Sequence, residues 1–252
     1  MSHLSPDNPI RVPNAECRLV VVQDQMQPCP YRDGIVARMP LRLPVGSVTP
    51  EVTDQLLAYG YRRSGDFVYR TQCPTCDACK PTRVDVERFQ PTNSMKRIQR
   101  RGERDLVHRW GEPRVDAKRI WLFNQHRIQR GLSQGSSPID AESYRSFLSD
   151  TCCETKELAI RLADELVAIA IVDIGKTSIS AVYTHFDPHA SRYSLGTYAI
   201  LRQMEFAIAT GRRYVYLGMY VEENSHLNYK ARFQPQQRLH DGEWRDIPVV
   251  ES

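Results

Sequence analysis

The chain has 252 residues, of which 41% are apolar, and its 34 basic and 30 acidic side chains give a formal net charge of +4. The length allows one large domain or two small ones, and the apolar fraction excludes a disordered or collagen-like chain. The longest aliphatic run, Leu166 to Val172, is far shorter than the ~18–20 residues of a membrane span. The first residues also lack the basic and apolar regions of a secretory signal. We therefore expect a cytoplasmic protein with no membrane partner, whose mild charge permits a polyanionic partner without requiring one.

The pattern of apolar residues and helix-capping residues predicts helices and strands along the chain. An early helix is well signalled, because Thr49 can cap it, Pro50 suits its first position and Gly60 follows its last turn. The other predicted elements follow in chain order: strands at 19–22, 61–70 and 83–89; a polar helix at 94–109, interrupted by Gly102; helices at 117–130 and 140–149; strands at 157–163, 166–174 and 178–186; a helix at 194–210; and a strand at 214–217.

The second half has the rhythm of an α+β unit. Three strands that look antiparallel are followed by a helix and a returning strand. We place a boundary between an N-terminal domain, residues 1–112, and a C-terminal domain, residues 113–252.

Seven cysteines are crowded into a few places. In a cytoplasmic chain, close spacing points to metal or redox chemistry rather than disulfides. Cys73, Cys76 and Cys79 are separated by two-residue gaps in a loop, and with Cys29 they form a candidate set of four ligands for zinc or an iron–sulfur cluster. The alternative is that these thiols stay free, one of them buried as a small apolar group.

The other three cysteines carry no predicted chemistry. Cys152 and Cys153 are adjacent, and neighbouring cysteines seldom chelate one ion, so we expect a structural role. Cys17 stands alone without an assigned role.

The predicted helix at 94–109 carries a basic face. Its basic residues fall within nine positions and span an arc of about 140°; they are Lys96, Arg97, Arg100, Arg101 and Arg104. Long cations on one face suit contacts with a phosphate backbone. A solvated helix face is the commoner explanation of such a run, and the spacing alone leaves both interpretations open.

The helix that begins near Ser194 offers a second candidate site. Unpaired N–H groups at a helix start can bind a phosphate or a developing oxyanion, and Gly196 beside Leu195 allows close approach. His185 and His189 lie on either side of Pro188, so we expect turn or surface residues rather than metal ligands. No nucleophile elbow, P-loop or Rossmann glycine run is present.

Several motifs in order resemble one family over nearly the whole chain. They are Cys29-Pro-Tyr31; Tyr61 to Arg70; Cys73-x-x-Cys76-x-x-Cys79-x-Pro81-x-Arg83-Val84; Tyr183-Thr-x-Phe-Asp-Pro188; Ser194-Leu-Gly-Thr-Tyr-Ala-Ile-Leu201; and Asn228-Tyr-Lys-Ala-Arg-Phe-x-Pro235. This set resembles the arginyl-tRNA–protein transferases and, more narrowly, the bacterial aspartate/glutamate leucyltransferases. Two stretches depart from the bacterial pattern: Tyr31-Arg32-Asp33 stands where Tyr-Leu-Pro is usual, and His226-Leu227 where Lys-Met is common.

The resemblance implies a fold and a reaction. The fold is an acetyltransferase-like (GNAT-like) fold in the C-terminal half, with a smaller N-terminal α/β region that carries the cysteine cluster. The reaction moves leucine from Leu-tRNA to the N-terminal Asp or Glu of a protein, which marks that protein for N-end-rule degradation, and it requires no cofactor. Arginyl transfer to the same acceptors is the close rival. An acetyl-CoA-dependent N-acetyltransferase and a non-catalytic tRNA- or metal-binding module are further alternatives.

The chemistry of this reaction selects candidate residues. Aminolysis of an activated ester by an α-amine of pKa ~7.7–8.0 needs orientation more than a strong base. We expect the N–H groups near Leu195 and Gly196 to hold the ester. Spacing alone leaves open whether Tyr229 packs and Lys230 faces solvent or both contact the reacting end of the ester, and the resemblance favours the contact. The resemblance puts the pocket for the aminoacyl end at Tyr183, Asp187, Ser194 and Tyr198, and tRNA on the basic face.

An acidic acceptor should be recognised by a cation, for which arginine has the better geometry. The candidates are Arg62 and Arg63, with Ser64 and Asp66 fixing the loop or binding the α-ammonium group. An ordinary pair of strand-surface arginines is the alternative.

Overall fold

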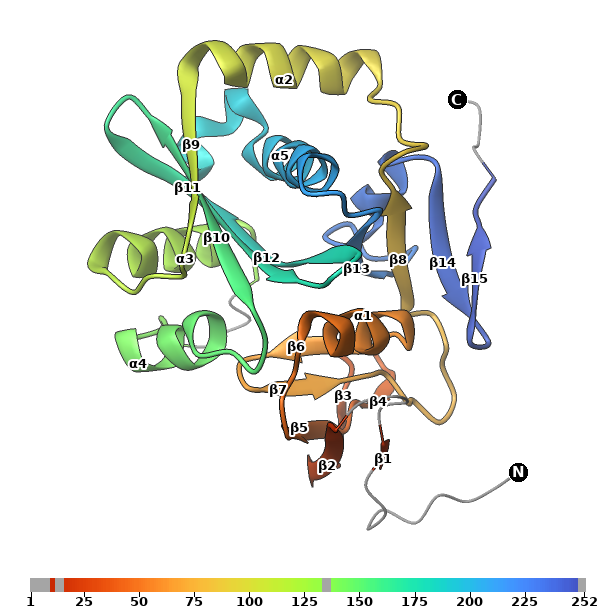
Figure 1. Cartoon of the computed structure of the whole chain (residues 1–252). Coiled ribbons are helices and arrows are strands. Elements are labelled where there is room, and N and C mark those ends of the chain that lie inside the picture. The colour runs from red at the N-terminus through yellow and green to blue at the C-terminus, as the bar shows by residue number, and fades with distance from the viewer. Residues whose placement is uncertain (1–9, 12–15, 133–136, 249–252) are drawn as a thin grey trace.

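The computed structural model describes residues 10–11, 16–132 and 137–248, and it is a mixed α+β structure (Figure 1). The helices are α1 (Pro50–Ala58), α2 (Asn93–Asp105), α3 (Ala117–Gln129), α4 (Ala141–Tyr144) and α5 (Leu195–Ala209), with a π-helical turn η1 (Arg145–Ser149) and 3-10 turns η2 (Pro188–Tyr193) and η3 (Asn228–Arg232). No helix among the described residues is long and apolar enough to cross a membrane.

Eight strands form the main sheet, in the order β15-β14-β8-β13-β12-β11-β10-β9. They are β8 (Lys80–Asp85), β9 (Leu106–Gly111), β10 (Thr155–Leu162), β11 (Glu165–Ile174), β12 (Ser178–Phe186), β13 (Tyr214–Tyr220), β14 (Gln236–His240) and β15 (Glu243–Asp246). All neighbours pair antiparallel except β12 and β13, which run parallel. The centre of the sheet is apolar, because β11 is buried from Leu166 to Ile174.

Helices cover the two faces of this sheet. Helices α2 and α5 lie together on one side, and α3 packs against β11 and β12 on the other (Figure 1). The two helices approach closely where Gly102 of α2 meets the ring of Tyr198 in the first turn of α5, and a Cβ atom on Gly102 would lie 2.2 Å from that ring. Gly102 therefore does not interrupt α2; it lets the two helices touch.

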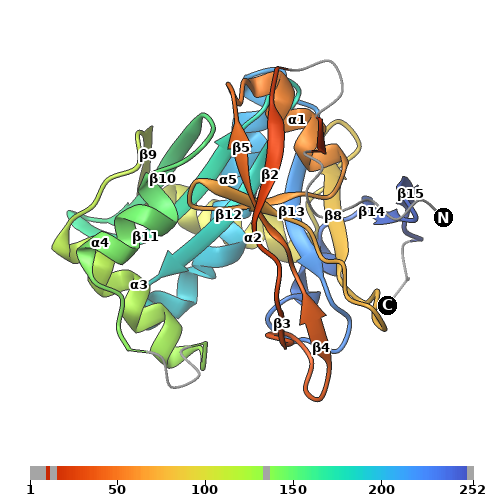
Figure 2. The ribbon, with the colours of Figure 1, turned by 90° about the horizontal axis from the view of Figure 1, so that it is seen from below.

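A smaller sheet lies under the main one. Its strands run in the order β1-β2-β5-β7-β6, and a separate ribbon of β3 and β4 projects from it (Figure 2). These strands are β1 (Ile10–Arg11), β2 (Arg18–Gln23), β3 (Met26–Pro28), β4 (Val36–Arg38), β5 (Leu41–Val45), β6 (Arg62–Ser64) and β7 (Phe67–Tyr69). Helix α1 is joined to the main sheet through the carboxylate of Asp54, which accepts hydrogen bonds from Thr177 and Ser178.

Most of the predicted elements are confirmed. Thr49 caps α1 by accepting the N–H of Val52, strand β12 has the predicted bounds, and the α+β class holds. The predicted succession of three antiparallel strands, a helix and a returning strand is β10, β11, β12, α5 and β13, and the returning strand β13 runs parallel to β12. The division at residue 112 stays a prediction, and strands from both sides of it, β8 and β9 as well as β10 to β15, share the main sheet.

Three expectations are wrong. The segment 61–70, predicted as one strand, is a hairpin of the two short strands β6 and β7, because the chain turns at Gly65, whose φ is +59°. The helix predicted to reach residue 109 ends at Asp105, and Leu106 to Gly111 form edge strand β9 on β10. His185 is not a surface residue: it is fully buried on β12, where its Nε2 lies 3.2 Å from the hydroxyl of Tyr144. His185 belongs to β12, which ends at Phe186, and it packs against Phe123 in the core under α3 rather than in the turn.

A second buried histidine accompanies it. His126 of α3 is 6% exposed and its ring lies 4.4 Å from that of Phe186. Burial, as the largest cause, lowers the pKa of His126 to about 4 and that of His185 to about 3. Both rings are therefore neutral in the folded protein at neutral pH.

Replacing Gly102 with Ala should destabilise the protein although alanine favours helices by ~1 kcal/mol. The added methyl group collides with Tyr198, so we expect a loss of roughly 1–3 kcal/mol in the free energy of unfolding, measured by urea denaturation. Gly111→Ala is the control, because nothing lies within 4 Å of its Cβ position. Equal stability of the Gly102→Ala variant and the wild type would contradict the contact.

The free energy of unfolding should fall as the pH drops from ~6.5 towards 4. In the unfolded chain His126 takes up a proton below its ordinary pKa of ~6.5. In the folded chain it stays neutral until the pH reaches its lowered pKa of about 4, so protons favour the unfolded chain between these values. His126→Gln removes this difference and should reduce the loss between pH 7 and 4 by on the order of 3 kcal/mol. Parallel curves of unfolding free energy against pH for the two proteins would show that His126 titrates normally.

Candidate functional site

The candidate site lies where β12 and β13 separate. The two parallel strands pair only from Ser178 to Ser180 with Tyr214 to Tyr216, and β13 then bulges at Gly218, whose φ is +90°. The guanidinium of Arg62 enters the gap from β6 and donates from Nη2 to the carbonyl of Ala181, 3.1 Å away. A Cβ atom on Gly218 would lie 2.6 Å from Nη1 of Arg62, so only glycine leaves this space.

Arg62 keeps one donor free at this point. Its Nη1 is buried and has no hydrogen-bond partner among the described residues. A buried unpaired donor of this kind is costly, and it is the arrangement expected of a group that binds an acceptor atom from outside the chain.

Lys230 lies beside Arg62. Its side chain is buried, and Nζ donates to the carbonyl of Met219, 2.5 Å away. Burial, followed by the charge of Arg62, lowers the pKa of Lys230 to about 7. A substantial fraction of this amine is therefore neutral near pH 7, which gives it the capacity to accept a proton.

Tyr229 adjoins Lys230 in η3. Burial raises the pKa of its hydroxyl, and the charges of Arg62 and Arg130 act in the opposite direction. The two residues predicted to contact the reacting end, Tyr229 and Lys230, are thus brought together with Arg62.

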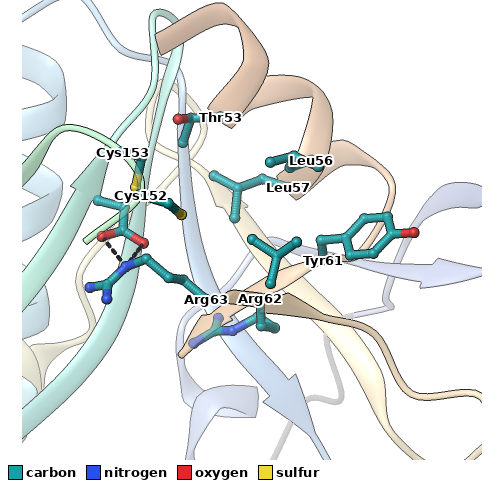
Figure 3. A pocket seen from close by; sticks show the side chains of 10 residues that line it. Thr53, Leu56, Leu57, Tyr61, Arg62, Arg63, Cys152 and Cys153 are labelled. Carbon is teal, nitrogen blue, oxygen red and sulfur yellow. Dashed lines mark hydrogen bonds and ion pairs between the residues drawn. The ribbon is translucent and has the colours of Figure 1, made fainter. Parts of the chain in front are cut away.

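Arg63, the other predicted acceptor-binding arginine, is differently placed. Its Nε donates to both carboxylate oxygens of Asp173, each 2.9 Å away, and its Nη1 donates to the carbonyl of Gly65. Both side chains of this ion pair are almost wholly buried, at 3% and 5% exposure. Figure 3 shows Arg63, with dashed lines to the carboxylate, in a small pocket under α1 that Cys152 and Cys153 also line. The charge of Arg63 is therefore already matched by Asp173, although Nη2 of Arg63 has no hydrogen-bond partner among the described residues.

Ser64 and Asp66 complete the β6–β7 hairpin that carries both arginines. Ser64 is half-buried and Asp66 is exposed. Because neighbouring strand residues face opposite sides, Arg62 points to the gap and Arg63 to the ion pair.

The four cysteines of the candidate metal set lie near one another without forming a metal site. Burial and the neighbouring Cys29, Cys73 and Cys76 raise the pKa of Cys79 to about 12. Within the described ranges, however, no group of three or more His, Cys, Asp or Glu side chains has the geometry to hold a metal ion. The Nη1 group of Arg32 donates to the sulfur of Cys76 at 3.3 Å. The cysteines as arranged here do not fit a metal, and metal binding stays a prediction.

The basic face of α2 is exposed to solvent. All five predicted residues, Lys96, Arg97, Arg100, Arg101 and Arg104, are exposed. Arg104 pairs with Asp105, and Arg101 donates to the carbonyl of Arg192 in η2. Among the described salt bridges, none involves Lys96, Arg97 or Arg100, so the face keeps most of its positive charge.

The start of α5 is covered on one side. Ser194 precedes it with φ of +49° and makes no side-chain cap. The ring of Phe186 lies 3.3 Å from the Cβ position of Gly196, so the glycine makes room for this ring. Phe186 therefore occupies the space beside the Cβ position of Gly196, and the backbone N–H groups of Leu195 and Gly196 stay predicted ligand contacts.

The four residues predicted for the aminoacyl pocket are not gathered together. Tyr183 packs with Phe123 and Phe147 in the cluster under α3, whereas Tyr198 is fully buried in the cluster between α2 and α5. Asp187 accepts the N–H of His189 within η2, and Ser194 is exposed.

Sequence reasoning missed Gly218, Asp173 and Arg130. Gly218 interrupts a buried aliphatic and aromatic strand, which is a signal for a bulge. Asp173 is the single carboxylate among the nine buried residues of β11, and a buried carboxylate needs a cation as its partner. For Arg130 the sequence carries no such signal.

Comparisons with known proteins agree along the chain. Residues 27–97 and 118–240 match the N-terminal and C-terminal parts of the family described as arginine-tRNA-protein transferase. A curated aspartate/glutamate leucyltransferase of Chromobacterium violaceum is 35% identical over 88% of this chain and 91% of its own. One of Saccharophagus degradans is 39% identical over 86% of this chain and 92% of its own.

Among solved structures, the C-terminal domain of a putative lysylphosphatidylglycerol synthetase from Agrobacterium fabrum has a TM-score of 0.49 at 15% identity, covering 77% of this chain and 62% of that chain. FemX has a TM-score of 0.42 at 8% identity, covering 78% of this chain and 79% of that chain. The resemblance seen in the motifs is confirmed by the curated relatives: the chain belongs to the arginine-tRNA–protein transferase family.

Proposed function

We propose that this chain transfers leucine from Leu-tRNA to the N-terminal Asp or Glu of proteins. The names of the curated relatives, aspartate/glutamate leucyltransferases, support the choice of leucine and of acidic acceptors. The observation that carries the proposal is the free Nη1 donor of Arg62, buried in the gap between β12 and β13 beside Lys230. In the cell the reaction marks proteins for N-end-rule degradation and takes place in the cytoplasm.

Arg62 is the group that recognises the acceptor. A guanidinium binds carboxylates with directional, charge-assisted hydrogen bonds. Arg62 has the free donor, while Arg63 is held in its pair with Asp173. Of the two arginines predicted from the sequence, we therefore assign acceptor binding to Arg62 and a supporting role to Arg63.

Lys230 and Tyr229 act at the reacting end. The acceptor α-amine attacks the ester carbonyl carbon; a C–N bond forms, the C–O bond to the tRNA ribose breaks, and the amine proton passes to the ribose oxygen. Lys230, with its pKa lowered to about 7, can take up and return that proton. The N–H groups of Leu195 and Gly196 remain our candidates for holding the ester oxygen.

The tRNA binds on the exposed face of α2. Three cations there make no salt bridge with a described residue, and each phosphate contact releases condensed counterions. The exposed Arg192 of η2, adjoining this face through Arg101, extends it towards α5.

A transfer assay tests the proposed function. Leu-, Arg- and Phe-charged tRNA are each presented with peptides that begin with Asp, Glu, Lys or Arg. We expect transfer of leucine to the Asp and Glu peptides. Transfer of arginine alone would favour the rival aminoacyl group, and acetyl-CoA turnover with no transfer in any pairing would overturn the proposal.

Arg62→Met should impair catalysis, whereas Arg63→Met should impair stability. Loss of Arg62 should reduce kcat/KM for an Asp peptide by a factor of about 100 with little change in stability, because a charged hydrogen bond to substrate is lost. Loss of Arg63 should lower the free energy of unfolding by about 3–5 kcal/mol, since Asp173 is left buried and unpaired. Steady-state kinetics and urea denaturation of both variants check this; identical behaviour of the two would contradict the division of roles.

Replacing Lys96, Arg97 and Arg100 together with Gln should weaken tRNA binding and flatten its salt dependence. With about three phosphate contacts removed, the slope of log Kd against log salt should fall by ~2–3, measured by filter binding. The matched control is a triple change of Arg18, Arg70 and Arg245, which lie outside α2. A slope unchanged from wild type would mean that α2 is only a solvated face.

A further inference from the structure

The turn at residues 221–228 joins β13 to η3, the segment that carries Tyr229 and Lys230. Two asparagine side chains organise it: Nδ2 of Asn228 donates to the carbonyl of Glu222 at 3.0 Å, and Asn224 makes the other bonds. The Oδ1 atom of Asn224 accepts the N–H of His226 at 3.0 Å, and its backbone carbonyl accepts the N–H groups of Leu227 and Asn228 at 2.9 and 2.8 Å. The shape of the turn entering η3 therefore depends on Asn224.

The same side chain reaches across the molecule. Its Nδ2 atom donates to the carbonyl of Tyr31, 3.0 Å away and 193 positions earlier in the chain. Tyr31 lies in the loop between β3 and β4, on the ribbon that projects from the smaller sheet (Figure 2). Asn224 thus fastens the turn of the C-terminal half to the N-terminal ribbon.

A second contact lies next to the first. Arg32 donates to Oε1 of Glu223 at 3.4 Å and to the sulfur of Cys76 at 3.3 Å. The side chains of Arg32 and Glu223 are 33% and 61% exposed, so solvent screens this ion pair. The bond from Asn224 to a backbone carbonyl is therefore the stronger of the two links.

The link lies near the candidate site. Burial raises the pKa of Tyr31 and lowers that of Lys230, and the charge of Arg62 acts on both, so the two residues come from opposite halves of the chain to the same surroundings. A change in the position of the 221–228 turn relative to the ribbon would shift η3 against Arg62.

We propose that Asn224 is a positioning residue: its bond to the carbonyl of Tyr31 fixes the 221–228 turn, and through it η3, so that Tyr229 and Lys230 face Arg62. The role rests on the proposed transfer reaction, but the link itself does not. Arg32 and Glu223 assist it. None of the three needs to touch the substrate.

Two variants of Asn224 separate its two bonds. Asn224→Asp keeps an oxygen for the N–H of His226 and loses the donor to Tyr31, whereas Asn224→Leu loses both. Asp24→Asn is the matched control, because it breaks the ion pair with Arg38 on the same ribbon without touching the turn. Hydrogen–deuterium exchange of the peptide covering 228–232 is measured together with kcat and KM for aminoacyl-tRNA.

We expect both Asn224 variants to exchange the 228–232 amides at least tenfold faster than wild type and to lose at least tenfold in kcat, with KM for aminoacyl-tRNA changed less than twofold. The control should match wild type in all three. If Asn224→Asp exchanges like wild type, the link to Tyr31 does not hold the turn and the proposal fails, even where Asn224→Leu does not fold. If wild type transfers no amino acid, the proposed function fails, and the exchange rates still decide whether the link exists.

Discussion

The buried ion pair of Arg63 and Asp173 is the interaction on which the candidate site depends. It joins the β6–β7 hairpin of the smaller sheet to the central strand β11 of the main sheet, with both side chains almost inaccessible to solvent. Thr155 adds a hydrogen bond to the same carboxylate at 2.9 Å. Compared with apolar side chains in the same place, two buried charges add little to the free energy of unfolding, but the fold is stable only while the two charges remain paired. We infer that the pair sets the register of the hairpin.

That register determines what Arg62 can do. Because strand neighbours face opposite sides, fixing Arg63 on Asp173 sends Arg62 into the gap between β12 and β13. Gly218 opens the gap for the guanidinium, and the pairing of β12 with β13 ends before it. Lys230 reaches the same place from η3 and is held by the carbonyl of Met219. The site is thus assembled around the guanidinium of Arg62 from four separate parts of the chain, which are β6, β12, β13 and η3.

The sequence predicted the fold better than the site. Helix caps at Thr49 and the long aliphatic strand β11 are local signals, and both are confirmed. The prediction carried α2 on to residue 109, but residues 106–111 pair with β10 as a strand, and this pairing is not a local property of the sequence. His185 was misplaced for a similar reason, since its burial depends on α3 packing over β12.

For the site, the resemblance to the family predicted Arg62, Tyr229 and Lys230 as candidates but could not distinguish Arg62 from Arg63. Their difference comes from Asp173, 110 positions after Arg63, and no local pattern links the two. The same holds for the link between Asn224 and Tyr31. Motifs therefore predicted candidate residues, whereas the partners that orient them required the three-dimensional structure.

The most direct test of the account is an NMR titration of the arginine side chains with an acceptor peptide. Protein labelled with 15N at arginine is titrated with a peptide beginning with Asp and with one beginning with Asn, the signals being assigned by Arg62→Lys and Arg63→Lys. The account predicts that the Asp peptide shifts the guanidinium signals of Arg62 and leaves those of Arg63 in place, and that the Asn peptide has a much smaller effect. A shift confined to Arg63, or none at either arginine while the peptide binds, would contradict it.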